Sequence, residues 1–422
     1  LTMITPLEQR VLDSIRMDEL TAFLSDLVAV PSINGTDDEN TAQQLVADLL
    51  NRLDMQVDVW DLDFEALRSH PAYSVECERT HGLGVVGAAG RGQGKTLLYN
   101  GHVDVVPVDD PSYWHFPPWQ GTVKDGRVYG RGTLDMKGGL CCAIFAAKAI
   151  RDAGVILKGR LFVESVIGEE DGGVGTLAAI LRGYKADGAV IMEPTRMVVA
   201  PAQAGALNFR VTIDGKVAHG AIRDEGVSAI EKFIPIHNAL LQFETERNAR
   251  DHSRYFPGEA LPFALNIGNV RAGQWASNVP ESLVFEGRYG VAPGEDVDQA
   301  RRDFEEVLRK TAEQDPWLRE HPPKLEWWGA QFLPASTPLE DPLVDCVSGA
   351  FADTAGEQPV LKGMPYGADM RLLVHQGNTP TVLFGPGDIR KAHQPDEFVP
   401  VEDLLQVTRT LALTALRFCG AE

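Results

Sequence analysis

The stretch LLYNGHVDVVPVDD, residues 97–110, begins as an apolar strand and ends in the polar side chains of His102 and Asp104. Alternate residues of a strand point to the same face, so these two side chains point together at whatever lies beyond the strand end. In open α/β sheets, ligands bind beyond the carboxyl ends of the strands. The stretch therefore predicts one buried strand of such a sheet, with a site at its end.

The segments around this strand extend the sheet. Further strands are expected at 55–60 (MQVDVW), 83–89 (LGVVGAA), 159–170 (GRLFVESVIGEE), 187–194 (DGAVIMEP) and 379–387 (TPTVLFGPG). Amphipathic or glycine-started helices are expected at 8–30, 38–54 and 135–150. Alternation of helices with nearly continuous apolar strands is typical of a mostly parallel sheet covered by helices.

The pattern changes between Ala204 and Leu333. Strands with alternating polarity are expected at 207–215, 263–273, 281–290 and 324–329, with helices at 226–244 and 295–314. Such strands indicate an open sheet with helices on one face. The sequence predicts an inserted α+β domain at 204–333, within a first domain made of 1–203 and 334–422.

Composition limits the class of function. Lys and Arg total 39 against 60 for Asp and Glu, a net charge of −21, which repels nucleic acid and anionic membranes. We find no apolar run of membrane-spanning length and no signal-peptide layout at the start, and so expect a cytoplasmic protein. The five cysteines form no CxxC pattern, which argues against a disulfide framework.

Other polar residues follow the remaining strands. Glu169 and Glu170 end one strand, Glu193 ends another, Asp135 opens a helix, and His393 lies in the loop after the last apolar strand. Each residue alone is more simply explained as a helix cap, a solvated turn or a structural histidine. Together, imidazoles and carboxylates without a thiol cluster suit a divalent metal ion, zinc first and then cobalt or manganese.

The order of five segments resembles one known family. GHVDVVP, GRGTLDMKGG, GEEDGG, MEPT and AHQPDE follow one another as in the M20 family of metallopeptidases and deacylases, along essentially the whole chain. The resemblance implies an α/β fold in which a mostly parallel-sheet catalytic domain binds two metal ions. It also implies that the inserted α+β domain is a lid that makes a homodimer.

The resemblance implies specific roles for the metal ligands. His102 and Glu193 would hold one metal ion, and Glu170 and His393 would hold the second. Asp135 would bridge the two ions, as carboxylates do in sites whose ions lie about 3.5–4 Å apart. The implied cofactors are two Zn²⁺, with Co²⁺ or Mn²⁺ as substitutes.

The remaining residues of this site receive supporting roles. Asp104 would accept the second N–H of the first imidazole ligand, and Glu169 would be the general base. Adjacent strand residues face opposite ways, so Glu169 and Glu170 can share a site only if the strand breaks before them, which the glycines of GEEDGG permit. The resemblance further implies a cis peptide bond between Asp135 and Met136.

The inserted domain contributes candidates of its own. His219 matches the family histidine that stabilises the oxyanion, Arg288 the arginine that binds a substrate carboxylate, and Asn278 a neighbouring polar contact. An alternative for Arg288 is a surface ion pair with Glu286. Gly385 is expected to let the backbone approach the ligand.

Three functions stay open. The first is a dizinc amidohydrolase that cleaves N-acyl-L-amino acids such as N-acetylornithine, favoured because glutamate at Glu193 is more typical of deacylases and carboxypeptidases than of aminopeptidases. The second is a dipeptidase or carboxypeptidase with the same site. The third is a non-catalytic binding module of the same fold, disfavoured because every candidate ligand and the base are present. The expected partner is a small acylated amino acid or dipeptide.

Overall fold

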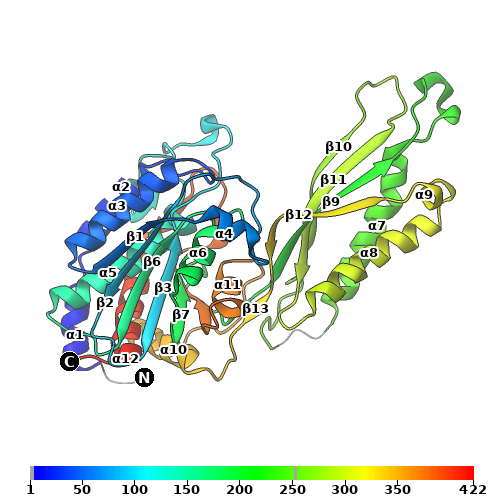
Figure 1. Ribbon diagram of the computed structural model, residues 1–422. Coiled ribbons are helices and arrows are strands. Elements are labelled where there is room, and N and C mark those ends of the chain that lie inside the picture. The colour runs from blue at the N-terminus through cyan, green and yellow to red at the C-terminus, as the bar shows by residue number, and fades with distance from the viewer. Residues whose placement is uncertain (1–3, 251–253) are drawn as a thin grey trace. The chain divides into compact units, whose positions relative to one another are not determined.

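The computed structural model describes residues 4–250 and 254–422 (Figure 1). The chain divides into two compact units. Unit 1 comprises Leu1–Ala202, Ser336–Lys362 and Ala368–Glu422, and unit 2 comprises Gln203–Ala335 and Gly363–Gly367. The second unit is therefore inserted between segments of the first, and each is described separately.

Unit 1 is built on a six-stranded sheet in the order β1-β2-β6-β3-β7-β14. The strands are β1 (Gln56–Asp61), β2 (Leu83–Ala89), β3 (Thr96–His102), β6 (Arg160–Val166), β7 (Gly188–Ile191) and β14 (Thr381–Leu383). Strand β2 is antiparallel to both neighbours, whereas β6, β3, β7 and β14 run parallel. The carboxyl ends of these four strands consequently lie at one edge of the sheet.

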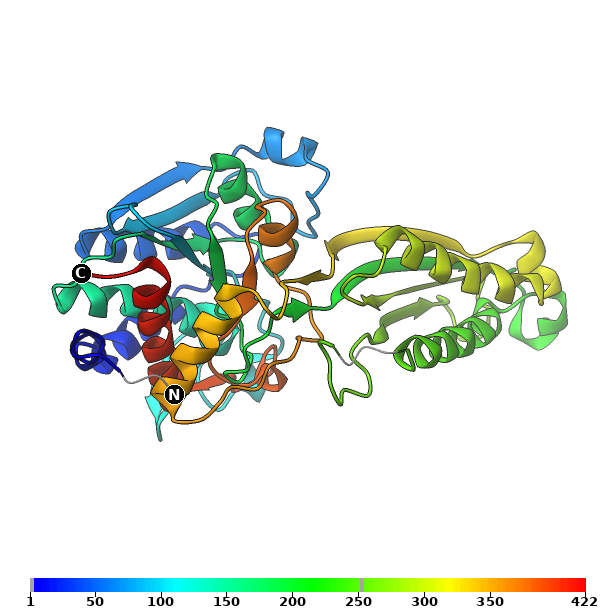
Figure 2. The same cartoon turned by 90° about the horizontal axis from the view of Figure 1, so that it is seen from below.

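Helices cover both faces of this sheet (Figures 1 and 2). Two adjacent residues of β3, which point to opposite faces, show the two layers. Tyr99 donates a hydrogen bond to the carbonyl of Leu411 in α12 at 2.5 Å, and Asn100 donates to Thr176 in α6 at 2.9 Å from the opposite face. The helices of unit 1 are α1 (Pro6–Asp13), α2 (Met17–Val28), α3 (Asp38–Arg52), α4 (Phe64–Ser69), α5 (Gly138–Asp152), α6 (Val174–Arg182), α10 (Pro342–Ala355), α11 (Met370–His375) and α12 (Val401–Cys419).

Short strands complete the first unit. A three-stranded antiparallel sheet is formed by β4 (Thr122–Lys124), β5 (Arg127–Tyr129) and β15 (Phe398–Pro400). This sheet pairs β5, which precedes the candidate residue Asp135, with β15, which follows the candidate residue His393. Strands β8 (Ala202–Gln203) and β13 (Ala335–Ser336) pair where the chain passes between the units.

Unit 2 is an antiparallel sheet in the order β10-β11-β9-β12, with helices packed on one face. Its strands are β9 (Gly205–Asp214), β10 (Leu265–Ala272), β11 (Ser282–Val291) and β12 (Lys324–Phe332), and its helices are α7 (Ala229–Asn248), α8 (Val297–Glu313) and α9 (Pro316–Glu320). Burial alternates along β9, so that Phe209 and Val211 enter a core with Phe304 of α8. This is the half-buried sheet that alternating polarity predicted.

The predicted fold class is confirmed by the mixed, mostly parallel sheet of unit 1 and the α+β layers of unit 2. Across residues 4–250 and 254–422, no helix is long and apolar enough to cross a membrane.

Candidate metal centre

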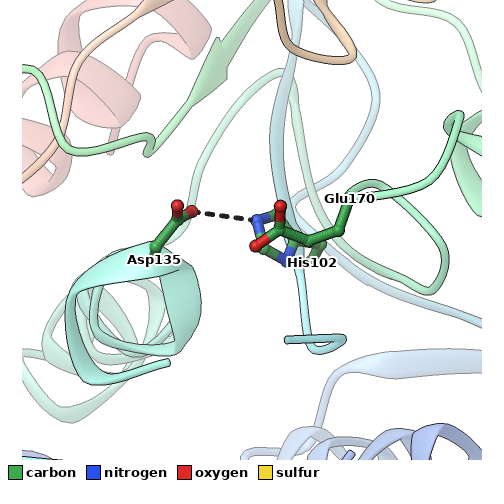
Figure 3. A group of neighbouring side chains, drawn as sticks. All are labelled: His102, Asp135 and Glu170. Carbon is green, nitrogen blue, oxygen red and sulfur yellow. Dashed lines mark ion pairs between the residues drawn. The ribbon is translucent and has the colours of Figure 1, made fainter. Parts of the chain in front are cut away.

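The predicted metal ligands of unit 1 gather at the carboxyl edge of its sheet. His102 is the last residue of β3, Glu193 follows β7, Glu170 follows β6, and Asp135 lies just before α5. Figure 3 shows His102, Asp135 and Glu170 pointing toward one another. Each of these three offers a ligand atom within 4.8 Å of the other two, as a shared metal ion requires.

Asp135 lies between two imidazoles. Its Oδ1 atom is 3.3 Å from Nε2 of His102, and its Oδ2 atom is 3.3 Å from Nε2 of His393. Nε2 of His393 also lies 3.2 Å from Oε1 of Glu170. A carboxylate with one oxygen toward each imidazole can bridge two cations.

Two further glutamates approach the first imidazole. Nε2 of His102 is 3.8 Å from Oε1 of Glu193 and 3.9 Å from Oε2 of Glu169. These three residues form a second group whose ligand atoms lie within 4.8 Å of one another. The distances alone therefore allow either glutamate to join His102 at a metal ion.

Asp104 has a different contact from the one expected. Nδ1 of His102 donates to the main-chain carbonyl of Asp104 at 2.9 Å, while the carboxylate lies 3.6 Å away. The carboxylate instead accepts the backbone N–H groups of Glu169 at 3.2 Å and Glu170 at 3.0 Å. These donors have left the strand ladder and need acceptors. Because Nδ1 donates to the Asp104 carbonyl, Nε2 is the ring nitrogen that faces the carboxylates and could bind a metal ion.

The turn that carries the two glutamates begins where β6 ends, at Val166. Gly168 has a φ of 67° and Gly173 a φ of 76°, in the left-handed region that glycine adopts readily. The strand break that the GEEDGG segment predicted is thus present. It lets Glu169 and Glu170 both approach His102 or His393 rather than face opposite sides of a strand.

Glu397 is a structural part of the centre that the sequence analysis did not identify. Its Oε1 atom accepts the N–H groups of Leu134 at 3.0 Å and Asp135 at 3.2 Å, and its Oε2 atom pairs with Arg131 at 2.6 Å. The peptide bond between Asp135 and Met136 is cis, as predicted. Glu397 lies within the segment AHQPDE, which is the one sequence signal that could have found it. Its role was not predictable, because the spacing of residues does not show which backbone N–H a carboxylate accepts.

The electrostatics of the centre favour a cation. Burial alone would lower the pKa of His102, but the charges of Asp104 and Asp135 raise it well above the usual value. Burial raises the pKa of Glu193, and repulsion from Asp135 adds to the rise. Burial and the nearby Glu193 raise the pKa of Glu169 in the same way. Negative charge is therefore crowded into a site that water does little to screen.

The donor atoms fit divalent metal ions. Nε2 of His102 and Oε1 of Glu193 are buried and have no hydrogen-bond partner among the described residues. Buried polar atoms are usually satisfied, so an orphan pair aimed at one point indicates a ligand there. Imidazoles and carboxylates together suit zinc, cobalt or manganese.

Within unit 2, two predicted residues lie side by side. His219 and Asn278 form an isolated antiparallel bridge, and Gly220 donates its N–H to the carbonyl of Ser277 at 2.6 Å. The exposed His219 ring accepts the N–H of Ala221 on Nδ1 at 3.1 Å. A neutral ring that accepts on Nδ1 carries its proton on Nε2, which is then a free hydrogen-bond donor.

Arg288 does not form the alternative ion pair with Glu286. Glu286 pairs with Arg210 at 2.6 Å instead. One guanidinium nitrogen of Arg288, Nη2, donates to the carbonyl of Pro365 at 3.3 Å, while its buried Nε has no partner among the described residues. Burial lowers the pKa of Arg288, and no carboxylate among the described residues offsets that effect. A half-buried guanidinium without an acidic partner among the described residues is a candidate anion site.

The fold leaves no space for a side chain at Gly385. A Cβ atom there would lie 2.3 Å from the carbonyl oxygens of both Met192 and Glu193. Its N–H donates to Oγ1 of Thr195 at 3.1 Å, and its carbonyl accepts the N–H of Met197 at 3.0 Å. The backbone of Gly385 thus packs against the segment that carries Glu193.

Comparisons with known proteins agree with this geometry. Residues 98–417 match peptidase family M20/M25/M40. The chain is 28% identical over 422 residues to the N-formyl-4-amino-5-aminomethyl-2-methylpyrimidine deformylase of Halalkalibacterium halodurans, covering 95% of each protein. It is 30% identical over 352 residues to the acetylornithine deacetylase of Myxococcus xanthus, covering 81% of this chain and 85% of that enzyme.

The fold is also that of a solved structure. The dipeptidase Dug1p of Saccharomyces cerevisiae superimposes with a TM-score of 0.77 at 15% identity, covering 99% of each chain. The family match extends over most of this chain, including unit 2. The chain belongs to peptidase family M20/M25/M40, whose members are hydrolases of amide bonds.

Proposed function

We propose that this protein is a deacylase that uses two divalent metal ions to hydrolyse the amide bond of N-acyl amino acids. The observation that carries the proposal is the position of Asp135, with one carboxylate oxygen 3.3 Å from each of two imidazoles. Three glutamates lie around it. Two four-ligand metal sites that share Asp135 need one histidine and one glutamate each when water fills the remaining positions, so one glutamate is left over.

The ligand assignment follows from these contacts and from the family. His102, Asp135 and Glu193 would hold one ion, and Asp135, Glu170 and His393 the other. Zinc is the first choice, because imidazole and carboxylate ligands suit it, and cobalt or manganese could replace it. Bound ions of this kind polarise a carbonyl and lower the pKa of a water molecule.

Glu169 is then left as the general base. It is 6% exposed, and burial raises the pKa of its carboxyl well above the ordinary value. Such a group is suited to take a proton from the attacking water and to return it to the departing amine. Asp104 supports this role, because its carboxylate accepts the N–H of Glu169.

We infer that His219 donates a hydrogen bond to the developing oxyanion. The support is the resemblance of its segment to the family histidine, together with the hydrogen bond from Ala221, which leaves the proton on Nε2. Asn278, its bridge partner, is inferred to contact substrate. Preorganised donors of this type contribute strongly to acyl transfer.

Arg288 supports a substrate that carries a carboxylate. Its guanidinium is half-buried and has no acidic partner among the described residues, so a substrate carboxylate would supply the missing charge. A planar fork of donors matches a carboxylate better than a single ammonium group does. This favours an N-acyl amino acid.

The similarity to the Halalkalibacterium halodurans enzyme favours a second candidate function. That enzyme is named as a deformylase of an N-formylated aminomethylpyrimidine, and the alignment covers 95% of each protein. Hydrolysis of a small N-formyl amine would use the same centre but would leave Arg288 without a charged partner. A dipeptidase or carboxypeptidase would use both the centre and Arg288.

A substrate panel tests these candidates. Acylated amino acids, dipeptides and N-formyl amines would be assayed with zinc or cobalt added. Arg288→Met is expected to lower kcat/KM for carboxylate-bearing substrates about 10–10²-fold, the usual effect of losing a charged hydrogen bond. Arg210→Met, which removes an arginine already paired with Glu286, is the matched control and should change kcat/KM little. Selective hydrolysis of uncharged N-formyl amines, indifferent to Arg288→Met, would favour the deformylase.

We further propose that unit 2 joins two copies of this chain. Strand β10 is an edge strand, and the adjacent α7 exposes Ile230, Ile234 and Leu241 by 46%, 53% and 45%. Val270 on β10 is also 46% exposed. An edge strand with one open side, beside an apolar helix face, is suited to self-pairing about a two-fold axis.

A further inference from the structure

Arg79 is a buried arginine of unit 1 that lies outside the proposed metal ligands. It is 4% exposed and belongs to the connection between α4 and β2. Two carboxylates, Glu39 of α3 and Asp171, are each 1% exposed and flank its guanidinium. Asp171 directly follows the glutamate pair Glu169 and Glu170 in the sequence.

All the N–H groups of this guanidinium have acceptors. Nε and Nη2 donate to Glu39, each at 2.7 Å, and Nη1 and Nη2 donate to Asp171 at 2.9 and 2.8 Å. Nη1 also donates to the carbonyl of Cys77 at 3.3 Å. A guanidinium has five donors in a fixed fork, so this site uses the whole inventory in two bidentate pairs.

The same guanidinium lies beside both ends of the turn Gly168–Gly172, which carries the two glutamates. Asp171 lies at the end of the turn, and its Oδ2 atom also accepts the N–H of Cys77 at 2.8 Å. Gly168 lies at the start, so close that a Cβ atom there would be 3.1 Å from the central carbon of the guanidinium. Glu169 and Glu170 lie between these two contacts.

The turn is also pressed against the segment that precedes Arg79. A Cβ atom on Gly172 would lie 1.7 Å from the carbonyl oxygen of Ser74, and Glu76 donates its N–H to the carbonyl of Asp171 at 3.0 Å. Glu39 connects this assembly to α3, which covers the sheet. The turn is therefore held by hydrogen bonds to both Arg79 and Asp104.

We propose that Arg79 is a positioning residue, which fixes the Gly168–Gly172 turn so that Glu169 and Glu170 face the metal centre. The expected effect of this orientation on turnover rests on the proposed function. A displacement of about 1 Å at a reacting group can cost about 10²-fold in rate. Lysine cannot replace the arginine, because one ammonium group cannot form two planar forks.

The test compares Arg79→Lys with the wild type, first without metal. Amide hydrogen exchange of residues 166–174 is expected to accelerate at least about tenfold in the variant, because local opening of the turn becomes easier. With metal restored, kcat should fall about 10–10²-fold while KM stays within about twofold. Asp171→Asn, which keeps the shape and removes the fork, should reproduce both effects if Arg79→Lys does not fold.

Arg417→Lys is the matched control. Arg417 also lies between two carboxylates of unit 1, with Glu8 and Asp353 each at 2.7 Å, but it contacts α1 and α10 rather than the turn. Unchanged exchange of residues 166–174 in Arg79→Lys and Asp171→Asn, or equal acceleration in Arg417→Lys, would overturn the proposal. The exchange measurement needs no substrate, so a wild type that hydrolyses nothing in the panel would refute the proposed function separately.

Discussion

At the residue scale, two adjacent glutamates receive different surroundings. Oε1 of Glu170 lies 3.2 Å from Nε2 of His393, whereas Oε2 of Glu169 lies 3.9 Å from Nε2 of His102. Burial raises the pKa of both side chains. A metal ligand must release its proton, and a base must exchange one, so the same residue type can fill both roles in one site.

Replacing the base should separate these roles. Glu169→Gln is expected to keep two metal equivalents and to lower kcat about 10²–10⁴-fold, because the amide cannot accept the proton of water. Metal content by elemental analysis and steady-state kinetics measure the two effects. Glu170→Gln is the comparison and should lose about one metal equivalent. Substantial turnover by metal-loaded Glu169→Gln would remove Glu169 from the mechanism.

At the scale of elements, the segments after β3, β6 and β7 bring charged groups to one sheet edge. In the metal-free protein, the proton held by His393 balances part of this negative charge. Burial would lower the pKa of His393, but hydrogen bonds to Asp135 and Glu170 raise it to about 11. The pKa values of His102, Glu169 and Glu193 are raised as well, so each of these groups holds its proton more tightly than usual. Metal ions must displace these protons.

Metal binding should therefore release protons and strengthen as pH rises. His393, with a pKa of about 11, carries a proton in the metal-free protein near neutral pH, and a cation favours its deprotonated form, so metal affinity falls as pH falls. Zinc titrations by calorimetry in two buffers of different ionisation enthalpy should differ by about one or more protons per chain at pH 7. Identical heats in the two buffers would contradict this expectation.

At the scale of the whole molecule, each unit has a core of its own. Unit 2 buries one face of its sheet under α7 and α8 and leaves apolar side chains exposed on the outer side of α7. Exposed apolar residues scattered singly are ordinary on proteins, but these lie beside an edge strand with one open side. The proposed homodimer would cover both features.

A charge on this surface should separate the copies. Ile234→Lys is expected to convert a dimer into a monomer, because an ammonium group would be buried against apolar side chains. Light scattering over a range of protein concentrations measures the mass. Val360→Lys, at a residue of unit 1 that is 60% exposed, is the control and should leave the mass unchanged. A wild type that stays monomeric would refute the surface assignment and leave the metal centre untouched.

Sequence patterns are enough to predict the fold class and to propose which segments supply the candidate site. Strand polarity separates a covered parallel sheet from a half-exposed antiparallel one, because each strand records how many of its faces are buried. The ends of buried strands then predict where functional side chains collect. His102, Asp135, Glu170, Glu193 and His393 were all named from such positions and from the order of their motifs.

Only the tertiary structure decided the contacts that aim these residues. The Asp104 carboxylate bonds to the Glu169 and Glu170 amides rather than to the His102 imidazole, and Glu397 holds the amide of Asp135. Likewise, Gly363–Gly367 joins unit 2, where Met364 accepts the N–H of Ala204 at 2.9 Å. The periodicity of a sequence reports which faces are buried, whereas hydrogen-bond partners far apart in the chain are chosen by where the folded backbone places its unpaired donors.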